Sequence, residues 1–502
     1  MTRIERNPEE FASDRYDVIV IGGGIYGACT LLEASRRGLR ALLLERDDFG
    51  GATSWNSLRI IHGGLRYLQT ADLRRFRRSV AEQAWWLQNF PDCVRPLSCL
   101  MPLYNQGLRR ASAMQAALFA NDALAGWIRR PYGVSLDSGQ IISSSETQSR
   151  FPMVRKDGLR AGALWSDAMM NSPQRTLIEV LRWATSAGGR ALNYVKAEGI
   201  ETDGNNKVRG VVGRCQVTHK RFDYVADLVV NCSGPWVSEL TENASPRPKT
   251  EPKILRQNAM ARAYNICVSR PLVKNEALAV TSDRGSTYFC VPHDEGQRTL
   301  IGTIHLPPSK DVEPTEAELS MFVNDFRTAV PAYELSLKDI DRVLPGRLPP
   351  STNGSHLPSK SPRIVLSRKL VGLVSVEGVK YTTARRIAEK ALILAFQSSS
   401  YSFPTYQNVV RPTPALLPPL THEAPASDLL DWIKQESVVH LDDLLLRRTD
   451  HLVGTAELRQ LAENVLSSTD WNEAKRRKEL TRISNGHGNC VSKTQQDAQH
   501  DK

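Results

Sequence analysis

The pattern of hydrophobic and polar positions is clearest at the start of the chain. Residues 16–21 are mostly apolar, which is typical of a buried strand. A turn, Gly22-Gly-Gly-Ile-Tyr-Gly27, follows, and a second apolar run, 41–44, ends at Glu45. A strand, a glycine turn, a helix and a strand in this order predict the opening βαβ unit of a nucleotide-binding sheet.

Further elements follow from the same periodicities. Helices are predicted at 72–90, 109–128, 173–187 and 315–329, and strands at 191–194, 208–214, 224–231 and 370–376. Short strand-like runs dominate between about 250 and 350, and a helix begins after Thr382. We therefore predict an α/β fold, in which a Rossmann-like dinucleotide-binding domain holds an inserted antiparallel-sheet substrate domain and is followed by a small C-terminal helical segment.

The domain boundaries follow from changes in composition. The nucleotide-binding domain is predicted to be discontinuous, with parts of 70–170 contributing to the substrate side, and residues 397–424 are rich in Ser and Pro, as in a linker. The polar tail lacks the large apolar residues of a core and is predicted to be disordered. The predicted units are 16–250 with 351–396, 251–350, the linker 397–424, the helical domain 425–482 and the tail 483–502.

The predicted helix 109–128 has an apolar face at 114, 117, 118, 124, 127 and 128, interrupted by Asn121. Packing against its own domain is the commoner explanation for such a face, and contact with a membrane surface is the alternative.

Composition excludes several classes of protein. The chain has 502 residues, with 65 basic and 54 acidic side chains and a formal charge of +11, which suits either an ordinary basic surface or an anionic partner. Eight cysteines are scattered without metal-ligand spacing, so neither a disulfide framework nor a metal site is expected. We find no nucleic-acid module, secretory segment or membrane-spanning run, and we expect a cytoplasmic protein, with peripheral contact on the inner face of a membrane left open.

The opening unit predicts a dinucleotide site. Gly22 permits the tight turn, Gly24 lets the backbone approach a pyrophosphate, and Gly27 lets the helix pack on the strand. The helix N-terminus offers N–H groups to the phosphates. Glu45 is placed to accept hydrogen bonds from a ribose, and its charge would repel the 2′-phosphate of NADP.

Three further motifs, which lie far apart along the chain, are suited to hold a flat ligand. Thr53-Ser-Trp-Asn-Ser57 leads into Ile61-His-Gly-Gly-Leu-Arg-Tyr-Leu68, where small hydroxyls and glycines let backbone approach beside a titratable ring. Val230-Asn-Cys-Ser-Gly-Pro-Trp236 predicts a strand ending in a turn. Val376-Glu-Gly-Val-Lys-Tyr-Thr-Thr-Ala-Arg385 predicts a second helix N-terminus, which can stabilise negative charge on a reduced flavin.

With these motifs, residues 16–395 resemble the FAD-dependent glycerol-3-phosphate dehydrogenases, within the D-amino-acid-oxidase-like flavoproteins. A weaker similarity lies at Leu441-Asp-Asp-Leu-Leu-Leu-Arg-Arg-Thr449. The resemblance implies bound FAD and oxidation of a secondary alcohol, sn-glycerol 3-phosphate to dihydroxyacetone phosphate, by hydride transfer to flavin N5. Electrons would then pass to a quinone or to oxygen. The acceptor and the oligomeric state are left open.

The resemblance also implies roles for individual residues. Lys380 would orient the substrate or stabilise flavin charge, Arg66 and Tyr67 would face the substrate, and Arg347 would bind its phosphate. His62 is the candidate base, although a scaffold role is equally expected. The residues implied to bind FAD are Gly22, Gly24, Gly27, Glu45, Thr53, Ser54, Ser57, His62, Gly63, Gly64, Val195, Ser233, Gly234, Gly378, Lys380, Thr382 and Thr383.

The substrate positions depart from the family pattern. Asn265 stands where the family has a histidine, and His293 and His305 stand in segments that also differ. A site whose hydrogen-bonding groups change type rejects its former ligand strongly. An anionic small-molecule substrate is therefore expected, with oxidation of an amine, amino acid or other hydroxy compound as one alternative and a non-catalytic FAD-binding protein as another.

Overall fold

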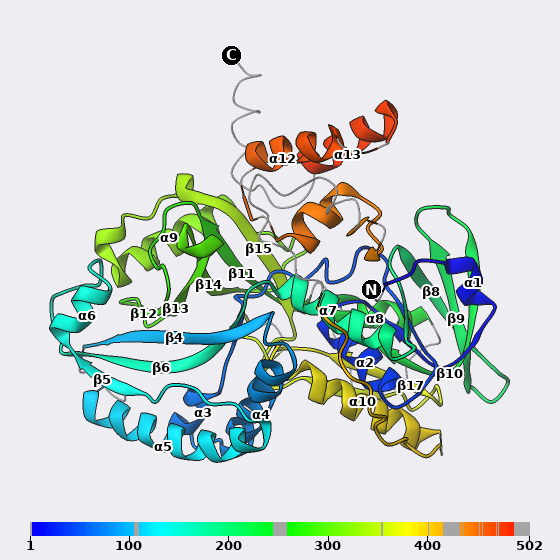
Figure 1. The fold of residues 1–502 in the computed structure, drawn as a ribbon, viewed down its shortest axis with the longest axis horizontal. Helices are drawn as coiled ribbons and strands as arrows, with labels where there is room; N and C mark the ends of the chain where they lie inside the picture. The colour runs from blue at the N-terminus through cyan, green and yellow to red at the C-terminus, as the bar shows by residue number, and fades with distance from the viewer. Residues whose placement is uncertain are drawn as a thin grey trace.

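The computed structural model describes residues 3–104, 110–243, 259–352, 355–399, 401–414, 432–433, 435–450, 452–453, 455–467, 469 and 471–485. Two sheets lie side by side, and the C-terminal helices lie over the junction between them (Figure 1). Among the helices described, none has both the length and the apolar character needed to cross a bilayer.

The first sheet is the predicted nucleotide-binding sheet. Its path runs β16-β17-β10-β1-β2-β7, and β1 pairs in parallel with both β10 and β2. The β8–β9 pair extends it through β10. Parallel strands are buried on both faces, so β1 and β2 are almost continuously apolar. The strands are β1 (Arg15–Ile21), β2 (Ala41–Leu44), β7 (Arg190–Leu192), β8 (Val195–Thr202), β9 (Val208–Cys215), β10 (Arg221–Asn231), β16 (Arg363–Leu366) and β17 (Leu373–Glu377).

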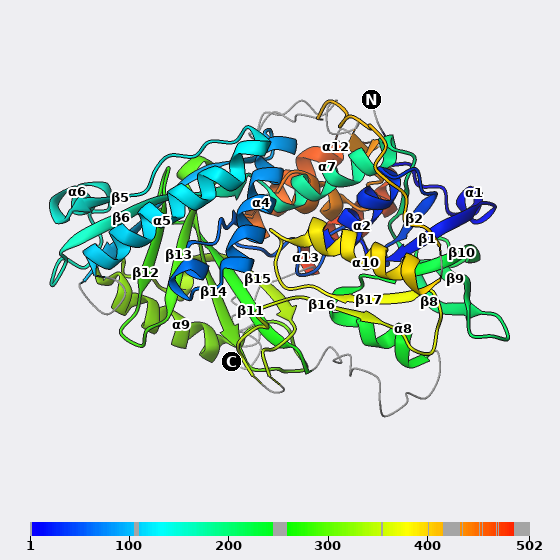
Figure 2. The same cartoon turned by 90° about the horizontal axis from the view of Figure 1, so that it is seen from below.

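Three helices pack together against this sheet (Figures 1 and 2). They are α2 (Ile25–Ser35), α7 (Pro173–Ser186) and α10 (Ala384–Ser398). Buried charge joins two of them, since Arg385 of α10 binds Glu33 of α2 at 3.5 Å. Arg385 also binds Glu82 of α4 (Leu73–Asn89) at 2.6 Å. The short helices α1 (Pro8–Ala12) and α8 (Val237–Asn243) contact β10 and β8 respectively.

The second sheet combines two separate parts of the sequence. Its order is β15-β11-β14-β13-β12-β4-β6-β3, with β5 on β6, so strands from 60–170 join strands from 261–348. The link is β4, which pairs in parallel with β12. The strands are β3 (Ile60–Ile61), β4 (Val94–Leu103), β5 (Gln140–Ser143), β6 (Ala161–Met170), β11 (Ala261–Val268), β12 (Ala277–Thr281), β13 (Thr287–His293), β14 (Arg298–Leu306) and β15 (Ile340–Leu348).

Helices flank the second sheet on its outer sides (Figures 1 and 2). The helix α9 (Glu316–Ala329) packs on this sheet, and its side chains Leu319, Phe322 and Phe326 are buried in the core between the helix and the sheet. The bounds of the predicted long helices agree with the structure to within two residues. The helices are α3 (Leu65–Gln69), α4 (Leu73–Asn89), α5 (Ala111–Arg129), α6 (Ser144–Arg150) and α9 (Glu316–Ala329).

The predicted apolar face of α5 is partly wrong. Met114 and Leu118 are buried as expected, but Trp127 is 70% exposed and Leu124 is also exposed. Phe119, which was not part of the predicted face, is 78% exposed. The apolar residues therefore lie on two sides of the helix, and only one side packs on the domain.

The C-terminal segment consists of a π-helical turn, Asp443–Arg448, and two helices, α12 (Thr455–Ser467) and α13 (Glu473–Asn485). The last helix extends three residues into the region predicted to be a disordered tail, whose remainder lies outside the described residues, as do residues 415–424 of the predicted linker. The seven cysteines within the described ranges are unpaired and buried, as predicted.

Candidate active site

A cavity of about 670 Å³ opens where the two sheets meet. The glycine turn after β1, the loop after β2, the turn after β10 and the loop after β17 all contribute to it. Strands β11 and β15 close it on the other side. The predicted site residues that line it are Gly22, Gly24, Glu45, Thr53, Ser54, Ser57, Ser233, Gly234, Arg347, Gly378 and Lys380.

The glycine turn brings the start of α2 to this cavity. A Cβ at Gly27 would lie 1.8 Å from the carbonyl oxygen of Gly22, so the close approach of helix and strand requires glycine. Gly24 is the N-cap of α2, and the N–H of Ile25 donates to Ser54 Oγ at 3.0 Å. The cavity wall thus holds the positive end of a helix dipole and small hydroxyls, a combination that fits a pyrophosphate.

Glu45 borders the same cavity at the end of β2. Its carboxylate accepts hydrogen bonds from the N–H groups of Gly23 at 2.6 Å and Asp47 at 2.9 Å. Burial raises the pKa of Glu45 to about 7. Its role in binding a ribose stays a prediction. Val195 lies beside Glu45, because the Val195 N–H donates to the Glu45 carbonyl at 2.7 Å.

The loop after β17 is held in place by a partly buried tyrosine. Tyr26 Oη accepts from the N–H groups of Val379 and Lys380 and donates to the Lys380 carbonyl at 2.8 Å. Burial raises the pKa of Tyr26 to about 12, so the hydroxyl keeps the proton that it donates. A Cβ at Gly378 would lie 2.1 Å from the Tyr26 ring, which gives this glycine a packing role that the sequence did not reveal.

Lys380 joins the cavity to the His-Gly-Gly motif. Its ammonium donates to Tyr67 Oη and lies 4.7 Å from the centre of the Tyr67 ring. Tyr67 and Arg66 belong to α3, and the contact with Lys380 brings Tyr67 next to the loop after β17. Thr382 and Thr383 begin α10 behind this loop, where the Thr382 carbonyl accepts from Trp86 Nε1.

His62 has a partner that the sequence analysis missed. Its Nδ1 lies 3.1 Å from Asp167 Oδ2, and the Gly63 N–H donates to Asp167 Oδ1 at 2.6 Å. Burial acts to raise the pKa of Asp167, but His62, Gly63 and Trp165 outweigh it and hold that pKa below its usual value. An ionised carboxylate only accepts, so His62 Nδ1 carries the hydrogen and Nε2 is left as an acceptor.

The His-Gly-Gly motif lies outside the 670 Å³ cavity. In the described chain, the cavity lining does not include His62, Gly63, Gly64, Arg66 or Tyr67. The side chain of His62 is 49% exposed. Asp167 could not be found from spacing, because β6 brings it to His62 across 105 residues of sequence.

Arg347 lines the cavity, and its guanidinium contacts a neighbouring loop. Nη1 donates to the Ser309 carbonyl at 2.7 Å and Nη2 to that of Lys310 at 2.5 Å. These contacts fix the loop after β14. A role in binding substrate phosphate stays a prediction.

The diverged positions lie in the second sheet. Asn265 lines the cavity, donating to the Asn56 carbonyl at 2.7 Å and accepting from Thr303 Oγ1 at 2.9 Å. Burial, with the charges of His356 and Arg66, lowers the pKa of His305 to about 4, so its ring is neutral near pH 7. His293 ends β13 and is partly exposed.

Fold and cavity together define a dinucleotide-binding oxidoreductase. Residues 17–389 match the family described as "FAD dependent oxidoreductase", and the chain belongs to that family. Its cofactor is FAD, as predicted, and the glycine turn, helix end and Glu45 fit the adenine dinucleotide portion. Membership of this family supports an enzyme over a flavoprotein without turnover.

Relatives within the family carry more specific names. The chain is 30% identical over 452 residues to a glycerol-3-phosphate dehydrogenase of Synechocystis sp., covering 87% of this chain and 80% of that protein. It is 28% identical to an aerobic glycerol-3-phosphate dehydrogenase of Staphylococcus haemolyticus, covering 75% of this chain and 66% of that one. A solved structure of the Bacillus halodurans glycerol-3-phosphate dehydrogenase with FAD is 21% identical and has a TM-score of 0.69, with 95% of each chain covered. The family expected from the sequence motifs is therefore confirmed.

Proposed function

We propose that the chain oxidises sn-glycerol 3-phosphate to dihydroxyacetone phosphate. The observation that supports this most is the 30% identity, over 87% of the chain, to a protein named for that activity. FAD, when bound, supplies the acceptor of the hydride from the substrate carbinol carbon. The cationic residues Lys380 and Arg347 line the cavity, and both are suited to an anionic substrate.

His62 is proposed as the base that takes the hydroxyl proton. Asp167 holds Nδ1, which leaves Nε2 free to accept that proton, and the carboxylate would stabilise the charged ring that results. Lys380 lies in the loop after β17 and is held by Tyr67, and it is proposed to orient the oxygen of the substrate that reacts. The two residues thus have separate tasks, proton removal and orientation.

The departures at Asn265 and His305 bear on the choice of substrate. Asn265 already binds Asn56 and Thr303, so it shapes the cavity wall instead of offering a titratable ring. His305, neutral near pH 7, offers ring nitrogens instead of a charge. We propose that these residues contact the glycerol portion of the substrate and leave the phosphate to arginine and lysine.

Product analysis tests the proposed reaction. The holoenzyme is incubated with a soluble quinone analogue as acceptor and with sn-glycerol 3-phosphate, glycine or proline, and the products are identified. We expect dihydroxyacetone phosphate, formed in step with acceptor reduction, and no reaction with the amino acids. A keto acid or imine product from glycine or proline, without turnover of glycerol phosphate, would favour the amino-acid alternative.

We also propose that the exposed side of α5 contacts an anionic membrane surface. Phe119 and Trp127 are its most exposed apolar residues, and α4, which packs against α5, exposes Arg74 and Arg77. Apolar anchors beside basic residues bind anionic bilayers. Sedimentation with vesicles of anionic lipid should fall when Phe119 and Trp127 are both changed to Ser. Equal sedimentation of the variant would contradict this proposal.

A further inference from the structure

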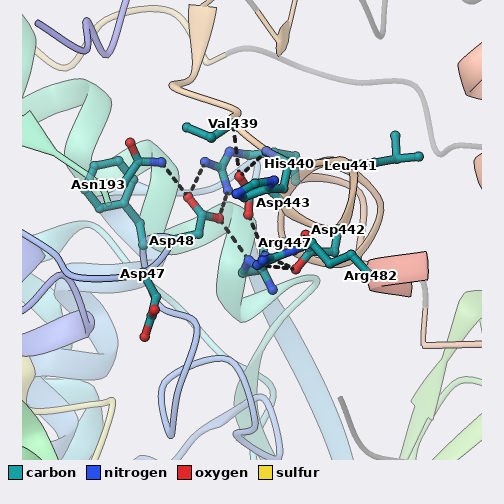
Figure 3. Close-up of polar contacts among 12 residues, drawn as sticks. Asp47, Asp48, Asn193, Val439, His440, Leu441, Asp442, Asp443, Arg447 and Arg482 are labelled. Atoms are coloured by element: carbon teal, nitrogen blue, oxygen red, sulfur yellow. Dashed lines mark hydrogen bonds and ion pairs between the residues drawn. The ribbon is translucent and has the colours of Figure 1, made fainter. Parts of the chain in front are cut away.

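A buried group of charges joins the C-terminal segment to the loop that follows β2. We call residues 45–51 the cofactor loop, because Glu45, Asp47, Asp48, Gly50 and Gly51 all line the cavity. The other charges come from the π-helical turn Asp443–Arg448 and from α13 (Figure 3). The two parts are about 400 residues apart in the sequence.

Asp48 is the centre of this group. Its Oδ2 accepts from Arg447 Nε at 2.9 Å and Arg448 Nη1 at 2.7 Å, and its Oδ1 accepts from Arg448 Nη2 at 3.0 Å and Asn193 Nδ2 at 2.9 Å. The residue is only 2% exposed. Burial acts to raise the pKa of Asp48, but Arg448 and Arg447 outweigh it and hold the pKa below its usual value. Four donors therefore fix one carboxylate in position and in charge.

The arginines are themselves held by carboxylates of the C-terminal segment. Arg447 Nη2 contacts Asp442 and Asp443, each at 2.6 Å. Asp443 also accepts from the N–H groups of Val439 and His440, and Arg482 of α13 binds Asp442 (Figure 3). If either guanidinium moved away from Asp48, a buried charge would be left without its partner, which costs free energy.

The opposite side of the cofactor loop is held by the start of β8. The N–H of Tyr194 donates to the Asp47 carbonyl at 2.9 Å, and that of Val195 donates to the Glu45 carbonyl at 2.7 Å. Tyr194 Oη donates in turn to Asp443 at 2.7 Å. The residues on one side of the cofactor loop are thus bound directly to the C-terminal segment on its other side. The loop that presents Glu45 to the cavity is thus clamped between β8 and the C-terminal segment.

The C-terminal segment also reaches the substrate side. Arg298 of β14 binds Glu457 at 3.0 Å, and Arg342 of β15 donates to the Val453 carbonyl at 3.0 Å. Arg59, just after the cavity-lining Leu58, binds Asp450 at 2.7 Å. One segment therefore contacts both sheets and the cofactor loop between them.

We propose that Arg447 and Arg448 are positioning residues of the FAD site, which act through Asp48 to hold the cofactor loop in the conformation that binds the adenosine ribose. On this account the C-terminal segment completes the cofactor site. Buried ion pairs often add little net stability compared with apolar packing, and fixing one geometry is their better-attested use. Here the geometry they fix is that of a ligand-binding loop.

Release of FAD from the holoenzyme tests this proposal without substrate, and so independently of the proposed reaction. The variants are Asp48→Asn, which keeps the shape but removes the charge, and Arg448→Lys, which keeps the charge but loses the two-pronged contact. Arg411→Met is the matched control, because Arg411 makes an equally two-pronged contact with Asp92, which does not line the cavity.

Flavin fluorescence after dilution gives the release rate, and thermal unfolding of the same samples gives Tm. We expect FAD release to be about tenfold faster or more in Asp48→Asn, with a smaller increase in Arg448→Lys. Arg411→Met should lower Tm without changing FAD release. If Asp48→Asn does not fold, Arg448→Lys decides alone. Unchanged release in Arg448→Lys, or equally faster release in Arg411→Met, would overturn the proposal.

Discussion

The cofactor half and the substrate half of this site are built differently. The cofactor half consists of backbone turns and a helix end around the cavity, with Gly27 packed directly on Gly22. The proposed substrate half consists of side chains from α3, β6 and the loop after β17, and His62 within it is half exposed. A site built from backbone turns suits a cofactor that stays the same when the substrate changes. A site built from side chains can be altered by substitution when the substrate changes. The two halves should therefore respond differently to substitution.

The largest effect is expected from Gly27→Val. A side chain there would collide with the Gly22 carbonyl, so α2 could not reach β1, and the purified protein should contain no FAD. The ratio of flavin to protein absorbance measures this. Gly126→Ala in α5 is the control, since an added Cβ there meets nothing within 4 Å. A Gly27→Val protein with full FAD content would show that the turn does not determine cofactor binding.

Asp167→Asn should affect the substrate half alone. The amide can donate to His62 Nδ1 and so favour the wrong tautomer, which removes the acceptor at Nε2. We expect flavin reduction by substrate to slow by about 100-fold, with FAD content unchanged. Anaerobic stopped-flow measures the rate. A normal rate would assign His62 a scaffold role, the other interpretation of its motif.

Lys380→Met should have a somewhat smaller effect in the same direction. The variant loses a charged donor near the reacting oxygen, which corresponds to about tenfold in the rate of flavin reduction. Lys390→Met, in α10 just after this loop and away from the cavity lining, provides the comparison. If the flavin is reduced equally fast in both lysine variants, Lys380 has no part in the reaction.

The smallest effect concerns pH and the cofactor half. The raised pKa of Glu45, about 7, means that its carboxyl is largely protonated below that pH in the ligand-free protein. A ribose hydroxyl donates better to the ionised form, so FAD affinity should rise with pH up to about 7, by at most about tenfold per unit. Fluorescence titration of the apoprotein at pH 6, 7 and 8 measures this. Glu45→Gln should remove the dependence, and a dependence that persists in Glu45→Gln would come from another group.

The stability of the ligand-free fold should show the opposite trend at Glu45. Its pKa is raised in the folded state, so its contribution to stability is fully present below its unfolded value and is lost as the pH rises towards about 7. Binding of FAD and folding of the apoprotein therefore respond to this one carboxyl with opposite signs.

The sequence predicted the cofactor half well because its signals are local. The apolar run 16–21, the glycine spacing and the acid after 41–44 all lie within 30 residues, and the structure places them as one unit at the cavity. The contact between Lys380 and Tyr67 was not predicted, although both residues lie in recognisable motifs.

The parts that the sequence could not predict depend on contacts between distant residues. Asp167 meets His62 only because β6 pairs with β3, and Arg448 meets Asp48 only because the C-terminal segment folds back over both sheets. The exposure of Trp127 escaped prediction for a related reason: helical spacing shows that residues share a face, but not which face has a partner.

The most direct test of the account is an anaerobic titration of the holoenzyme with sn-glycerol 3-phosphate. The account predicts that the visible flavin absorbance bleaches in proportion to added substrate and that Asp167→Asn, with the same FAD content, bleaches much more slowly. A flavin that stays oxidised with glycerol 3-phosphate, but is reduced by an amino acid, would contradict it.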